Sequence, residues 1–120
     1  SIIATGTLVS RAVAAAAQLK AEGISARVIN LSTVSPLDTA EILAAAKETK
    51  AIITAEESET RGGVGGAIAE FVVQNHPVAM KLLGTDTFAP TGSTSYLLEH
   101  YGLTADAITA VARELLKNGR

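Results

Sequence analysis

The sequence has neither cysteine nor tryptophan among its 120 residues. Disulfide bonds and thiolate metal sites are therefore excluded. Aromatic residues are scarce as well, with two Phe and two Tyr. Because 48% of the residues are nonetheless hydrophobic, the core must consist of aliphatic side chains and alanine. Such a core suits helices that pack closely on a sheet.

Long apolar runs and an excess of positive charge are also missing. The longest apolar run, Ala12–Ala17, is far too short to cross a bilayer, and no signal or targeting segment is recognisable. The net charge is −2 with both signs interspersed, so no basic patch is available for nucleic acid. We therefore expect a cytoplasmic protein with no membrane or nucleic-acid partner.

A chain of this length forms one domain, able to bury roughly two-thirds of its unfolded surface. It starts with Ser1–Gly6, already inside a strand-like run and without Met. We therefore expect the chain to be part of a larger polypeptide.

Short apolar runs alternate with helical patterns along the chain. We predict strands over residues 2–5, 27–31, 51–55 and 78–83, and helices over residues 10–22, 39–47, 64–75, 95–101 and 105–117. Asp38 begins a capping box. Gly23 and Gly102 are each followed by a hydrophobic residue, the signature of a Schellman helix end.

Strands that alternate with helices predict an α/β fold with a parallel sheet covered on both faces. The strands are nearly continuous apolar runs, as buried parallel strands are. We favour the strand order 2-1-3-4, which places the topological switch point between the first and third strands. The loops there are Thr5–Thr7 and Glu56–Gly66, at the sheet edge where ligands of open α/β sheets bind.

The loop Glu56–Gly66 holds four glycines in five positions between a strand and a helix. It lacks the Lys-Ser or Lys-Thr of a Walker A loop, and its spacing does not fit the dinucleotide fingerprint. Three acids precede the glycines and only Arg61 offsets them, so a phosphate would meet repulsion. We therefore predict that the glycines permit a tight turn and a close approach of helix and strand.

The acids of this loop do not form a catalytic pair. Glu56 and Glu57 are adjacent at a strand end, so their side chains point to opposite faces. Either would serve as a lone base or as a hydrogen-bond acceptor for N–H groups at a facing helix terminus. His76 and His100 fit no metal-binding spacing, and a receiver domain is excluded because no acid follows the first strand.

We therefore assign no catalytic, cofactor-binding or metal-ligating residue. The glycine loop is predicted to be a structural joint or an interface. Its candidate residues are Glu56, Glu57, Arg61, Gly62, Gly63, Gly65 and Gly66.

Six motifs, in order and at matching spacing, resemble the C-terminal domain of the transketolase family. They are Ile2–Thr7, Gly23–Asn30, Pro36–Asp38, the TAEE…GGVGG segment Thr54–Gly66, Leu83–Phe88 and His100–Thr104. The resemblance covers essentially all of residues 1–120 and is nearest to transketolases encoded as two halves. The same domain type occurs in deoxyxylulose-phosphate synthase and in 2-oxoacid dehydrogenase β subunits, but the YGLT and PLD motifs look most like transketolase.

The resemblance implies a three-layer α/β/α domain with a mostly parallel sheet of four to five strands. We expect the chain to start after the family's first, antiparallel strand and its sheet to have four parallel strands. It also implies a whole enzyme of the pentose phosphate pathway that binds thiamine diphosphate and Mg²⁺ and transfers a two-carbon ketol unit between phosphosugars. In the family those contacts come from the preceding domains or subunit, across a homodimer interface.

The chain departs from the family at Ser58, where a His often follows the paired Glu. The resemblance implies that this domain supports domain packing and dimer assembly without binding a cofactor itself. Two alternatives remain open. One is a related parent enzyme of the kinds named above, and the other is a stand-alone module that binds a small ligand at the switch point.

Overall fold

A parallel four-stranded sheet forms the centre of the computed structural model, which describes residues 1–118. The strands are β1 (Ile2–Ala4), β2 (Val28–Asn30), β3 (Ala51–Glu59) and β4 (Ala79–Thr85). They lie in the order β2-β1-β3-β4, and every neighbouring pair is parallel. The predicted order is confirmed, and the switch point lies between β1 and β3.

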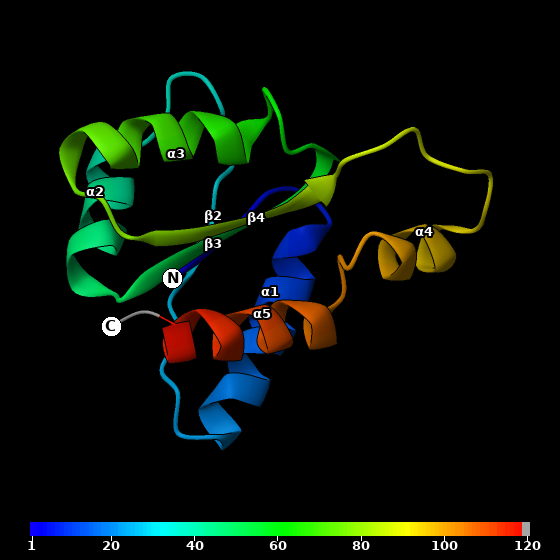
Figure 1. Ribbon diagram of the computed structural model, residues 1–120, viewed down its shortest axis with the longest axis horizontal. Coiled ribbons are helices and arrows are strands. Elements are labelled where there is room, and N and C mark those ends of the chain that lie inside the picture. The colour runs from blue at the N-terminus through cyan, green and yellow to red at the C-terminus, as the bar shows by residue number, and fades with distance from the viewer. Residues whose placement is uncertain (119–120) are drawn as a thin grey trace.

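Helices cover both faces of this sheet (Figure 1). They are α1 (Leu8–Ala21), α2 (Thr39–Glu48), α3 (Val64–Asn75), α4 (Thr94–His100) and α5 (Ala105–Asn118). The helices α1 and α5 pack on one face, and α2 and α3 on the other. The expected three-layer α/β/α fold is therefore confirmed. Within residues 1–118 no helix is both long and apolar enough to cross a membrane.

The sheet separates two aliphatic cores. On the α1/α5 face, Leu8 and Ile108 are fully buried, and on the α2/α3 face Ile42 and Ile68 are. Throughout the described residues, every buried hydrophobic side chain is Ala, Val, Leu or Ile. The scarcity of aromatic residues thus leads to close packing of small and branched side chains, as the composition predicts.

Helix ends form as the sequence predicts. After α1 the amide of Ile24 donates to the carbonyl of Leu19 at 2.9 Å, and Gly23 has a φ of 78°. This is the Schellman arrangement, and Gly102 repeats it after α4 with a φ of 67°. The carboxylate of Asp38 caps α2 by accepting a backbone N–H at 3.1 Å.

The third strand is longer than predicted, because it runs to Glu59 rather than to Ala55. A register shift follows Ala55, after which Glu59 pairs with Thr85 of β4. The charged residues of this extension are held in the sheet by the neighbouring strand and not by their own β propensity. The other element boundaries differ from prediction by no more than two residues.

Candidate functional site

The two switch-point loops begin side by side. The amide of Thr5, after β1, donates to the carbonyl of Ala55 in β3 at 3.2 Å. From there the chain continues through the end of β3 and the glycines into α3. We call residues 54–66 the strand-to-helix joint.

Glu56 is the central side chain of the joint, and only 2% of its surface is exposed. Its Oε2 accepts the amide of Gly65 at 2.7 Å, and its Oε1 accepts the hydroxyl of Ser58 at 2.8 Å. The N-cap residue Gly63 has no side chain to cap the helix. The carboxylate of Glu56 therefore caps α3 from the adjacent strand, where it also meets the positive end of the helix dipole. Glu56 thus forms the hydrogen bond to a helix terminus that was one of the two alternatives for the acids.

The four glycines of the loop serve different purposes. Gly62 has a φ of 74°, a conformation that other residues rarely adopt. A Cβ on Gly63 would lie 1.9 Å from Glu56 Oε1, and one on Gly65 would lie 2.5 Å from Thr54 Oγ1. At Gly66 the nearest atom to a Cβ would be 3.4 Å away, which is ordinary contact. The predicted tight turn and close helix–strand approach are confirmed, and Gly62, Gly63 and Gly65 account for them.

Sequence reasoning missed a fifth glycine of this region, Gly84 in β4. A Cβ there would lie 2.5 Å from the carbonyl oxygen of Ser58. This position allows β4 to approach the extended end of β3. A glycine inside a strand is a signal of close backbone approach, but the predicted strand ended at residue 83 and β4 continues to Thr85.

The remaining predicted residues, Glu57 and Arg61, are exposed and do not join Glu56. Glu57 is exposed in β3, one residue beyond Glu56. In the described part of the chain the ion pairs are Arg27–Glu48 and Arg113–Glu22, so neither residue belongs to one. Residues 1–118 also hold no cluster of three His, Asp or Glu side chains that would bind a metal.

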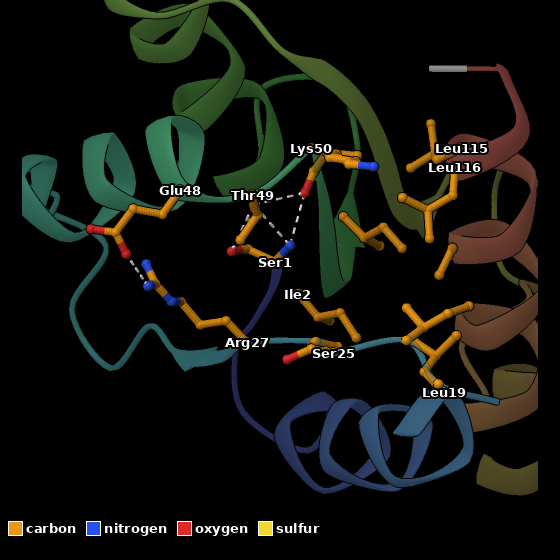
Figure 2. A pocket seen from close by; sticks show the side chains of 16 residues that line it. Ser1, Ile2, Leu19, Ser25, Arg27, Glu48, Thr49, Lys50, Leu115 and Leu116 are labelled. Atoms are coloured by element: carbon orange, nitrogen blue, oxygen red, sulfur yellow. Dashed lines mark hydrogen bonds and ion pairs between the residues drawn. The ribbon is translucent and has the colours of Figure 1, made fainter. Parts of the chain in front are cut away.

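A hollow of about 520 Å³ lies at the opposite end of the sheet, where the strands begin. Figure 2 shows Leu115 and Leu116 of α5 on one side of it and Ile2 of β1 facing them. The Arg27–Glu48 ion pair lies at its rim. The hollow is therefore separate from the switch point, where the sequence places its candidate residues.

Comparison with known proteins identifies the family. The family model for the transketolase C-terminal domain matches residues 1–108. The chain belongs to this family. A 6-deoxy-6-sulfo-D-fructose transketolase subunit from Clostridium sp. (strain MSTE9) is 42% identical over 116 residues, which are 96% of this chain and 36% of that protein. The 1-deoxy-D-xylulose-5-phosphate synthase of Heliobacterium modesticaldum is 44% identical over 117 residues, 96% of this chain and 18% of the synthase.

A solved structure described as a split gene transketolase, inactive β4 tetramer, has the same fold. Its TM-score is 0.94 at 35% identity, over 99% of this chain and 39% of that one. This transketolase C-terminal domain therefore spans well under half the length of the relatives it matches.

The joint of this transketolase C-terminal domain does not fit a diphosphate. Its helix N-terminus is already occupied by the Glu56 carboxylate, and Glu57 and Glu59 add negative charge beside it. A diphosphate placed there would displace a buried hydrogen bond and face repulsion from all three acids.

Thr54, the first residue of the joint, provides a stability test. Its Oγ1 is buried without a hydrogen-bond partner, and an unpaired buried hydroxyl is destabilising. We expect Thr54→Val, which keeps the shape, to raise the free energy of unfolding by about 1 kcal/mol. Urea denaturation followed by circular dichroism measures this, with Thr109→Val as a control, since Thr109 Oγ1 is hydrogen-bonded to Gln18. A loss of stability in Thr54→Val would contradict the interpretation.

Proposed function

We propose that residues 1–120 form the C-terminal domain of a thiamine-diphosphate-dependent transketolase. Such an enzyme transfers a two-carbon ketol unit between phosphosugars, here in the pentose phosphate pathway. The observation that carries this proposal is the 42% identity to a transketolase subunit over nearly the whole chain. The matched region makes up 36% of that subunit.

The domain supports the enzyme and takes no part in its chemistry. The position of Glu56 supports this role, because the protein's own carboxylate fills the helix terminus at the switch point. Thiamine diphosphate and Mg²⁺ are bound by the cofactor-binding domains or subunit that complete the enzyme. The complete enzyme, with this domain and the cofactor-binding part together, is a cytoplasmic homodimer. The loops Glu56–Gly66 and Thr85–Gly92, at the carboxyl edge of the sheet, face the neighbouring domains.

A second candidate parent enzyme is 1-deoxy-D-xylulose-5-phosphate synthase. The 44% identity to the synthase of Heliobacterium modesticaldum favours it. The two candidates differ in product, so the whole protein distinguishes them. We expect the full-length enzyme, supplied with thiamine diphosphate and Mg²⁺, to transfer ketol units between phosphosugars. Formation of 1-deoxy-D-xylulose 5-phosphate instead would establish the second candidate.

The supporting role has its own test in calorimetry. Once a cooperative thermal transition shows that residues 1–120 are folded, thiamine diphosphate and Mg²⁺ are titrated into them. We expect no saturable heat, because the joint repels a diphosphate. Saturable binding at micromolar concentrations would mean that this domain binds the cofactor. The proposal that other domains or another subunit bind it would then be wrong.

A further inference from the structure

An exposed arm follows β4. Residues 86–96 are all exposed, and Figure 1 shows the chain leaving the body of the domain after β4 and returning through α4. We call residues 86–96 the arm. Phe88 is fully exposed, at 103% of its reference surface, and Tyr96 is 52% exposed. An aromatic side chain held in water without any contact is an unsatisfied hydrophobic group.

The arm has the composition of an interface core. From Thr87 to Leu98 the sequence TFAPTGSTSYLL contains no charged residue. Solvated loops normally carry charges, whereas the centres of protein interfaces are depleted of charge and enriched in aromatic residues. The arm therefore resembles a surface that is covered in the complete protein.

Local contacts hold the arm in shape. The hydroxyl of Tyr101 donates to the carbonyl of Thr87 at 3.1 Å and closes its base. Ser93 Oγ accepts the amide of Tyr96 at 3.2 Å and starts α4. Gly92 lies so close to the Tyr96 ring that a Cβ there would be 2.6 Å from its Cδ1. Phe88 thus projects from a preorganised loop, which lowers the entropy cost of docking.

The geometry argues against a second copy of this chain as the partner. The hollow lies where the strands begin, whereas the arm follows the carboxyl end of β4. Arg27, Glu48 and Lys50 line the hollow, and an uncharged arm inserted into the hollow of another copy would take these charged groups out of water without adding a partner for them.

We propose that the arm docks through Phe88 into an apolar concave surface on the cofactor-binding part of the same enzyme. This inference rests on the proposed function, in which such a part exists. The relatives leave room for it, because the matched regions are 36% and 39% of their lengths. Phe88 is the anchor, and the uncharged residues around it exclude water from the contact.

Photo-crosslinking in the full-length enzyme tests the proposal. Benzoylphenylalanine replaces Phe88 in one variant and Val73, which is 65% exposed on α3, in a control variant. After irradiation we expect peptide mapping to find position 88 crosslinked to the cofactor-binding part and position 73 not. Crosslinks from position 88 only to another copy of this domain, or none in an intact assembly, would overturn the proposal.

A second measurement does not need the unnatural residue. In the assembled enzyme we expect Phe88→Ala to raise hydrogen exchange in residues 86–96 at least tenfold, while Val73→Ala leaves it unchanged. Unchanged exchange in Phe88→Ala would overturn the docking. If the enzyme shows the crosslink but no ketol transfer, the proposed transketolase activity is wrong and the docking of the arm stands. If the enzyme is active but shows no crosslink, the docking of the arm is wrong and the proposed activity stands.

Discussion

Replacing Gly63 by alanine should destabilise the domain by about 3 kcal/mol. The added methyl group would lie 1.9 Å from Glu56 Oε1 and 2.2 Å from the carbonyl oxygen of Glu59. The carboxylate is able to rotate away only by giving up its bond to the helix, and the carbonyl belongs to the β3 backbone. Relief therefore requires α3 to move off the sheet. Urea denaturation followed by circular dichroism would measure the loss as a shift of the midpoint.

Gly66→Ala is the matched control for this substitution. It adds the same methyl group three residues later, where the nearest atom would be 3.4 Å away. Because alanine is a better helix former than glycine, we expect a gain of about 0.5–1 kcal/mol. If Gly63→Ala and Gly66→Ala changed the free energy of unfolding equally, glycine flexibility in general would explain both effects. Close contact of Gly63 with β3 would then not be the reason that glycine is needed there.

Removing the buried carboxylate should have a similarly large effect. We expect Glu56→Ala to lower the free energy of unfolding by about 2–4 kcal/mol. The substitution leaves the amide of Gly65 without its acceptor and opens a cavity beneath α3. Loss of a charge at a helix N-terminus adds to the cost.

Glu56→Gln separates the hydrogen bond from the charge. Its amide oxygen still accepts from Gly65, so we expect a loss of only about 1 kcal/mol from the missing charge. Glu57→Ala, one residue along on the exposed face, should change stability very little. If Glu57→Ala destabilised as much as Glu56→Ala, the capping role of Glu56 would be wrong. Thermal unfolding of the three variants side by side provides the comparison.

Local signals predict most of this fold. The helix Val64–Asn75 has the predicted bounds, because glycines precede it and Pro77 follows it. The strand order follows from the alternation of strands and helices, since right-handed crossovers leave few arrangements. These features depend on near neighbours in the chain, which the sequence displays directly.

Features that depend on distant neighbours were harder to predict. The extension of β3 to Glu59 needs β4 beside it. The difference between Gly65 and Gly66 depends on Thr54 and Leu82, which touch only the first of them. For Glu56 the sequence leaves two alternatives, a lone base or an acceptor at a helix terminus, because the fold alone brings the amide of Gly65 to its carboxylate. In each case the deciding atom belongs to another element of the fold.

The capped end of α3 has a consequence for what this edge of the sheet is able to bind. The joint keeps the geometry with which related sheet topologies hold anions, yet it supplies the anion from its own chain. Glu56 thus behaves as a tethered ligand that is always bound and never exchanged. A helix end occupied in this way does not respond to metabolite concentration. It becomes a fixed structural element, and the surrounding loops are free to evolve as contacts between domains.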